Sequence, residues 1–145
     1  MFHSILIPVD GSPMSLRPIQ PAIDLAKMSR AGMVVLSVAE PRLYRASDYD
    51  AIQSGRDVEH MHLEAARQTV EKVRVLAEEA GVRCKSVVSM SALPCDEILS
   101  TVEKENCDLI VMATRGNMGI IDTIFSESTT QEVLQKASVP VLVFP

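Results

Sequence analysis

The sequence predicts a single α/β domain over residues 1–145, built on an open five-stranded parallel sheet with helices on both faces. Five short apolar runs alternate with stretches of helical periodicity, the pattern expected of strand–helix repeats. Four of these runs are nearly continuous Val, Ile, Leu and Met, which is typical of strands covered on both faces. A chain of 145 residues can also bury a core of its own without help from disulfides or metals.

The strands are expected at residues 5–9, 33–38, 82–90, 109–112 and 139–144. The third run places Arg83 and Lys85 among apolar residues, and charges of this kind discourage unwanted pairing at the edge of a sheet. We therefore predict an edge strand there. The last run is uncharged, so we expect its exposed edge to seek a partner.

Helices are expected between the strands. The clearest covers residues 57–80, where apolar positions recur every three or four residues and Gly81 follows as a C-cap. Its predicted buried stripe consists of Met61, Ala65, Thr69, Val73, Leu76 and Ala80. Residues 41–56 before it form a long polar connection, and loops of that length are often functional.

The other helices begin at less regular signals. The first carries the stripe Leu16, Ile19, Ile23 and Ala26. Pro21 breaks a hydrogen bond of this helix unless the regular helix begins only near it. Pro94 opens a shorter helix, and Ser128 with Gln131 resembles a capping box for the last helix, which runs through Lys136.

Composition argues against several classes of function. The net charge of −5 and the lack of a Lys/Arg cluster argue against a nucleic-acid partner. Three cysteines without Cys-x-x-Cys spacing argue against a disulfide framework or a zinc site. His60 and His62 point to different faces of one helix, so we expect no metal there. No signal peptide or membrane-spanning run is seen, which favours the cytoplasm.

Ligands of open parallel sheets bind at the carboxyl ends of the strands, where three segments are of interest. Asp10 follows the first strand, and its carboxylate either accepts hydrogen bonds from a ribose or an amine, or caps the next turn. The second segment is Val38-Ala39-Glu40-Pro41, at the end of the second strand. Gly116 and Gly119 follow the fourth and either admit phosphates to the backbone or simply form a turn, with Arg115 adding positive charge.

Several known catalytic patterns are missing from the sequence. It contains no Walker A sequence, no Gly-x-Gly-x-x-Gly after the first strand and no Gly-x-Ser-x-Gly elbow. It also offers no base–nucleophile pair, and Cys95, whose place at a helix start favours a lowered pKa, is a weak redox candidate. We therefore expect a protein that is not an enzyme.

Taken together, four segments resemble the universal stress protein family. These are ILIPVDGSPMSLRPIQPAIDLAK, LSVAEP, CDLIVMATRG and VLQKASVPVLVFP, in this order along nearly the whole chain. The resemblance implies a Rossmann-like adenine-nucleotide fold with strand order 3-2-1-4-5. It also implies a homodimer formed by pairing of the last strands, residues 139–144.

The family's nucleotide binders are similar in a loop written Gly-x2-Gly-x9-Gly-Ser/Thr, from which this chain departs. Ala113 replaces the first glycine, and Gly116 keeps the second. Counted forward from Gly116, the third glycine position falls on Ser126, which Glu127 follows. Counted back from the last strand, with one residue inserted, it falls on Glu127. A carboxylate about 4 Å from a phosphate costs about 4 kcal/mol at an effective dielectric constant of 20. The resemblance implies nucleotide-binding positions at Pro8, Val9, Asp10, Val38, Met112, Ala113, Arg115, Gly116, Gly119, Ser126, Ser128 and Thr129.

Two functions follow from this resemblance. The first is a cytoplasmic stress-response dimer that binds ATP weakly or not at all and acts through contacts with protein partners. The second is a genuine ATP or AMP binder, with Mg²⁺ if ATP, that uses Ser128 and Thr129 in place of Gly-Ser and hydrolyses ATP slowly at most.

Overall fold

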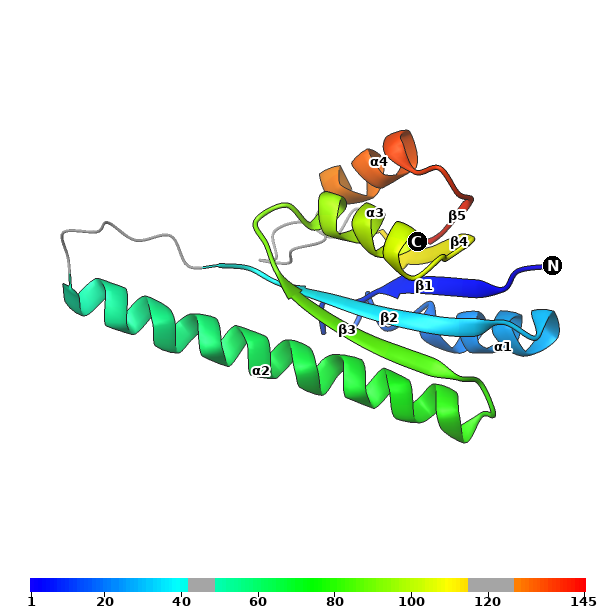
Figure 1. Cartoon of the computed structure of the whole chain (residues 1–145), viewed down its shortest axis with the longest axis horizontal. Helices are drawn as coiled ribbons and strands as arrows, with labels where there is room; N and C mark the ends of the chain where they lie inside the picture. Colours follow the sequence, from blue (N-terminus) through cyan, green and yellow to red (C-terminus); the bar gives the residue numbers. More distant parts are fainter. Residues whose placement is uncertain (42–48, 115–126) are drawn as a thin grey trace.

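A computed structural model describes residues 1–41, 49–114 and 127–145, without the side chains of residues 49–56 and 127–128. Strands and helices alternate along the whole chain (Figure 1). Their order is β1 (Ser4–Pro8), α1 (Ile19–Ser29), β2 (Gly32–Ala39), α2 (Tyr49–Glu79), β3 (Cys84–Met90), α3 (Pro94–Lys104), β4 (Leu109–Ala113), α4 (Glu127–Lys136) and β5 (Val141–Phe144).

The strands form one parallel sheet in the order β3-β2-β1-β4-β5. This confirms the predicted fold class, the strand order and the edge position of β3. The first strand pairs on one side with β2, where Ser4 faces Gly32, and on the other side with β4, where Ile5 faces Leu109. The order of the strands therefore reverses between β1 and β4, which is where parallel sheets open a crevice at their carboxyl ends.

Two helices cover each face of the sheet (Figure 1). Because side chains alternate along a strand, Ile5 and Ile7 of β1 pack on the side of α1 and α2, whereas Leu6 packs on the side of α3 and α4. Ile23 contributes to the first of these two cores, and Ile98 to the second. The sheet is thus buried on both faces, which explains why its central strands have so few polar residues.

The first helix begins at Ile19, with Pro18 at its N-cap. Pro21 therefore lies in the first turn, where a backbone N–H has no partner within the helix, and it breaks no hydrogen bond. Of the two possibilities that the sequence left open, the later helix start is confirmed. Leu16 precedes the helix and 42% of it is exposed, so its predicted place in the buried stripe is wrong.

The second helix departs from the prediction in its start and in its buried face. It begins at Tyr49 rather than at residue 57, so helix replaces half of the expected long loop, whose residues 42–48 lie outside the described part. The buried face consists of Ala66, Val70, Val73 and Ala77. Met61 and Leu76, which are 67% and 51% exposed, lie elsewhere. The predicted and the observed series both have helical spacing, and both contain Val73. The series that packs against the sheet is the one whose small and β-branched side chains allow close approach.

The later elements agree more closely with the prediction. Pro94 stands in the first turn of α3, and the next helix ends at Lys136 as expected. That helix begins at Glu127, so Ser128 lies within it rather than at the N-cap, and the predicted capping box is wrong. None of the helices in the described ranges is long and apolar enough to cross a membrane.

Candidate functional site

The carboxyl ends of β1, β2 and β4 bring several of the predicted site residues to one end of the sheet. Pro8, Val9, Val38 and Met112 are all buried there. The side chains of Val9, Val38 and Met112 belong to the core, so they shape the end of the sheet rather than offer polar groups to a ligand. Ala113 ends β4 and is only partly buried.

Asp10 is the first polar residue after β1 and orders the turn that follows. Its Oδ1 accepts a hydrogen bond from the backbone N–H of Ser12 at 2.9 Å, and its own N–H donates to the Ser15 hydroxyl oxygen at 3.2 Å. The Ser15 hydroxyl in turn donates to the Ser12 carbonyl at 3.0 Å. Asp10 therefore does cap the turn. Within the described part of the chain its Oδ2 accepts no hydrogen bond, so the same carboxylate also keeps an oxygen for a ligand.

A cavity of about 400 Å³ opens beside this carboxylate, between the ends of β1 and β2 and the middle of α2. This volume lies within the range of small-molecule sites, about 300–1,000 Å³. Small residues form most of its wall, which leaves room at a place where larger side chains would fill the space. Its lining residues are Asp10, Gly11, Ser37, Val38, Ala39, Glu40, His62, Ala65, Ala66 and Thr69.

His62 belongs to this cavity although sequence reasoning did not place it there, whereas Glu40 lies in the segment that was expected to bind ligands after the second strand. The Nδ1–H of His62 donates to the carbonyl oxygen of Glu40 at 3.2 Å, which ties α2 to the end of β2. We considered His62 only as a metal ligand with His60, and no metal-binding group of three or more such side chains occurs among the described residues. The signal that could have placed it is its position one helical turn before the buried Ala66.

The charges at the cavity favour a neutral ligand with hydrogen-bond donors. Asp10 and Glu40 both line it and carry carboxylates, whereas His62 is the one residue of basic type among the described residues of its wall. A ribose hydroxyl or an exocyclic amine can donate to a carboxylate, while a phosphate group at the same place is repelled. The cavity thus suits a neutral group that donates hydrogen bonds.

The remaining predicted positions belong to the segment after β4. Thr129 is buried in the first turns of α4, and the hydroxyl oxygen of its neighbour Thr130 is buried with no hydrogen-bond partner in the described structure. Arg115, Gly116, Gly119 and Ser126 lie outside the described residues, and so does the side chain of Ser128. The predictions for these five residues stay predictions.

The three cysteines are buried, and the pKa of each thiol lies above its usual value. Burial raises the pKa of the Cys95 thiol, and the carboxylate of Glu132 adds to the effect, so the lowered pKa expected at this helix start is wrong. Burial also raises the pKa of Cys84, to about 11, and that of Cys107. All three thiols are free and buried, which makes them protonated core residues near neutral pH.

Known proteins are similar to this chain in sequence and in fold over its full length. The Universal stress protein family matches residues 1–145. A universal stress protein of Methanocaldococcus jannaschii is 31% identical over 99% of this chain and 82% of its own length. The structure of a Lactobacillus plantarum universal stress protein, UspA, superposes with a TM-score of 0.81 at 21% identity, covering 99% of this chain and 97% of that one.

Two further structures with this fold contain adenine nucleotides. A universal stress protein from Archaeoglobus fulgidus in complex with dAMP has a TM-score of 0.68 at 19% identity and covers 99% of this chain and 98% of that one. Another, in complex with cAMP, has a TM-score of 0.68 at 18% identity, covering 99% of this chain and 96% of that one. With the family match over its full length, the chain belongs to the universal stress protein family.

Proposed function

We propose that this protein is a stress-response regulatory module that receives the nucleoside end of an adenine nucleotide and holds ATP weakly or not at all. The observation that carries the proposal is the cavity of about 400 Å³ beside Asp10, whose carboxylate keeps one oxygen for a ligand. Relatives of the same fold in complex with dAMP and cAMP support an adenine nucleoside as the occupant.

Weak binding of ATP follows from the charges around the site. Asp10 and Glu40 already give one side of the cavity a negative potential, and Glu127 replaces a family glycine at the expected phosphate position. Glycine at the start of a helix lets phosphate oxygens approach the backbone N–H groups, whereas a carboxylate occupies the positive end of the helix itself. The adenosine moiety therefore provides most of the affinity.

The second candidate is a true ATP or AMP binder, with Mg²⁺ accompanying ATP. It is favoured by the hydroxyl-bearing residues that begin α4, where Ser128 and Thr129 stand in place of the family's Gly-Ser. In this version the nucleotide acts as a switch and is hydrolysed slowly at most. Neither version makes the protein an enzyme in the ordinary sense, because neither provides a base beside a nucleophile.

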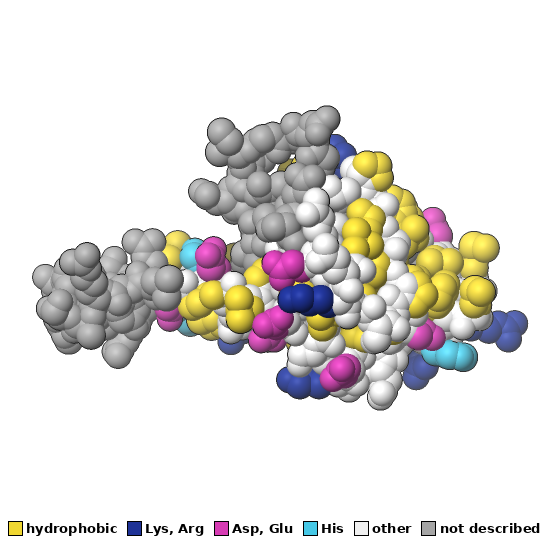
Figure 2. Space-filling view, turned by 90° about the horizontal axis from the view of Figure 1, so that it is seen from above, with side chains coloured by type: hydrophobic (Ala, Val, Ile, Leu, Met, Phe, Trp, Pro, Cys, Tyr) yellow, Lys and Arg dark blue, Asp and Glu magenta, His cyan; other side chains and the backbone are white. Residues whose placement is uncertain are grey.

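The regulatory role requires protein contacts, and we propose a cytoplasmic homodimer joined through β5. In the described sheet β5 pairs with β4 alone, so its other edge is open to a partner strand. Leu142 of this strand is 43% exposed and Leu134 of the neighbouring α4 is 52% exposed. Figure 2, which looks onto the side of α3 and α4, shows hydrophobic side chains gathered on that surface.

Calorimetric titration of nucleotide-stripped protein with ATP, AMP and adenosine, with and without Mg²⁺, tests the proposal. We expect adenosine to bind at least as tightly as ATP. Asp10→Asn should weaken adenosine binding while its Oδ1 still orders the turn, and Asp24→Asn, on the exposed side of α1, is the matched control. Micromolar ATP binding at least tenfold tighter than adenosine establishes the second candidate. Failure of every ligand to bind refutes the nucleoside site.

A further inference from the structure

The edge strand β3 uses alternate residues to pair with β2. The backbone N–H of Met33 donates to the Arg83 carbonyl at 2.8 Å, and at the other end of the strand the N–H of Ser91 donates to the Ala39 carbonyl at 2.9 Å. In a parallel pair each residue directs both its N–H and its C=O to one side, and the side alternates along the strand. The odd-numbered residues of β3 therefore bond to β2.

The even-numbered residues of β3 consequently direct their backbone groups to the open edge. The N–H of Cys84 confirms this direction, because it reaches outward to Oε1 of Glu78 on α2 at 3.5 Å. The N–H and C=O groups of Ser86, Val88 and Met90 follow along the same edge. Since β3 ends the sheet, no strand in the described ranges covers them. Such an edge is a template for another strand.

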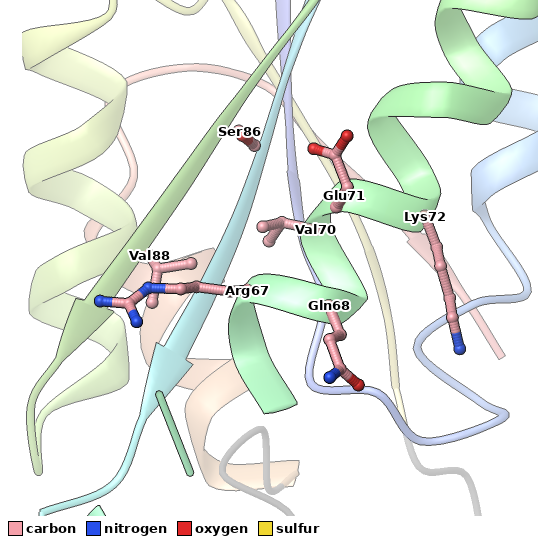
Figure 3. A pocket seen from close by; sticks show the side chains of 7 residues that line it. All are labelled: Arg67, Gln68, Val70, Glu71, Lys72, Ser86 and Val88. Atoms are coloured by element: carbon pink, nitrogen blue, oxygen red, sulfur yellow. The ribbon is translucent and has the colours of Figure 1, made fainter. Parts of the chain in front are cut away.

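A groove of about 720 Å³ runs beside this edge, between β3 and α2 (Figure 3). Val70 and Val88 give it an apolar floor. Arg67 extends from α2 toward Val88, and Glu71 lies on the side of Ser86, whereas Lys72 points away from the strand (Figure 3). The groove thus joins unpaired backbone groups, an apolar floor and a charged wall.

The charged wall is part of a row on α2 that consists of Arg67, Glu71, Arg74 and Glu78. Their spacings of four, three and four place them on one side of the helix. Within the chain, Arg74 contacts both Glu71 and Glu78, and the hydrogen bond from Arg74 lowers the pKa of Glu71. The signs alternate, so the row read backwards has every sign reversed. Two antiparallel copies would set Arg67 against Glu78 and Glu71 against Arg74.

Sheet geometry allows the two rows to meet. Because the buried residues of α2 pack with both β2 and β3, its axis lies roughly over the gap between these strands. Strands lie about 4.8 Å apart, so continuing the sheet from β3 into a copy of β3 places the two α2 axes about 10 Å apart. Helices pack at about 8–10 Å. The twofold axis of an antiparallel strand pair is perpendicular to the sheet and keeps both helices on one face.

The centres of the strand and of the charge row also coincide. Glu78 lies beside Cys84, and the centre of the row is about 8 Å further along the helix at 1.5 Å per residue. The same distance along β3 is about 2.5 residues, which reaches the middle of the strand near Val87. A twofold axis there sets Ser86 opposite Val88. Lys85 meets no like charge, because it lies opposite Ser89 and pairs with Glu105 of its own chain at 2.9 Å.

We propose that β3 pairs antiparallel with β3 of a second copy of this chain, about a twofold axis through Val87, and that the charge rows of the two α2 helices face each other. This interface lies at the opposite edge of the sheet from β5 and does not depend on nucleotide binding. A protein that uses both edges assembles beyond the dimer, with β3 joining one pair of chains and β5 the next.

Sedimentation of charge variants, each checked for folding by circular dichroism, tests the proposal. Glu71→Arg or Arg74→Glu alone sets like charges against each other twice in the dimer. Each variant should therefore associate at least about tenfold more weakly than wild type. A 1:1 mixture of the two variants should recover association as a heterodimer, because charges of opposite sign then meet across the interface. Neither chain in that mixture regains the internal ion pair between residues 71 and 74, so recovery reports the contact between chains.

Two further variants separate this interface from other effects. Ser86→Pro removes an outward N–H that a monomer does not use, so it should abolish the association through β3 and leave at most a dimer joined through β5. Glu132→Arg on α4, which breaks an exposed contact to Lys136, is the matched control and should leave it unchanged. A monomeric wild type at tens of micromolar, single variants that associate like wild type, or a mixture that does not recover would each overturn the proposal. Association through β5 alone would be insensitive to the α2 variants.

Discussion

Gly11 lies in the turn after β1, where the backbone comes close to Thr69 of α2. Replacing Gly11 with Ala tests how closely these two segments approach. Its φ angle is +83°, a conformation that residues with a Cβ rarely adopt. An added Cβ would lie 3.2 Å from Oγ1 of Thr69. That hydroxyl donates to the Ala65 carbonyl at 2.9 Å, so it cannot move aside without stretching its own hydrogen bond.

A second glycine separates the cost of backbone strain from the cost of the contact with the Thr69 hydroxyl. Gly81, which follows α2, has a φ angle of +86°, but an added Cβ would meet nothing within 4 Å. Gly81→Ala therefore measures the backbone strain alone, about 1 kcal/mol after the stiffer unfolded chain offsets part of it. Gly11→Ala adds the disturbed hydroxyl, which contributes about 1 kcal/mol more. We expect it to cost about 2 kcal/mol in total.

Urea unfolding of Gly11→Ala, Gly81→Ala, Thr69→Ala and the double variant Gly11→Ala/Thr69→Ala measures these free energies. Without the Thr69 hydroxyl, Gly11→Ala should cost no more than Gly81→Ala, so the double-mutant cycle should give a coupling of about 1 kcal/mol. Equal costs for the two glycine variants, or a coupling near zero, would refute the contact between the turn and α2.

Three other predictions concern stability and thiol reactivity. Ile98→Ala should lower the free energy of unfolding by about 2–5 kcal/mol in urea titrations, because its side chain is fully buried. Burial raises the pKa of Asp108, but hydrogen bonds from the backbone N–H groups of Ser4 and His3 outweigh this and hold it below its usual value. Asp108→Asn should therefore cost about 1 kcal/mol at pH 7, after solvent screening, and this difference should shrink as the pH falls below about 4. Iodoacetamide should alkylate Cys95 more slowly in native protein than in urea at pH 8.

The sheet could be predicted from the sequence because its chemistry is local. A strand covered on both faces must be apolar at consecutive positions, and Val34, Val35 and Leu36 show this directly. The edge strand was equally visible through Lys85, whose charge a central strand could not bury. Strand order, by contrast, came from the resemblance to a family, since no local rule states which strand lies beside β1.

The buried face of α2 and the cavity could not be predicted in the same way. Spacings of three and four fit the series through Met61 as well as the one through Ala66, and only packing against β2 and β3 distinguishes them. His62 reaches the cavity because of the position of α2 along the sheet, a contact over 22 residues that periodicity does not encode. Asp10 shows a different limit, since both of its alternative roles are compatible with the same geometry.

The place of β1 between β2 and β4 sets the order in which the chain can complete its fold during synthesis. Once Leu36 has been made, β1 can pair with β2, but its other partner begins at Leu109. At about 5–20 residues per second, a ribosome needs about 4–15 s to add the intervening residues. Throughout that time a central strand that is apolar at every position after Ser4 keeps one unpaired edge. The crevice at the strand reversal forms only when β4 joins β1, whereas the described wall of the cavity beside Asp10 lies within residues 10–69 and is made with the early half of the chain.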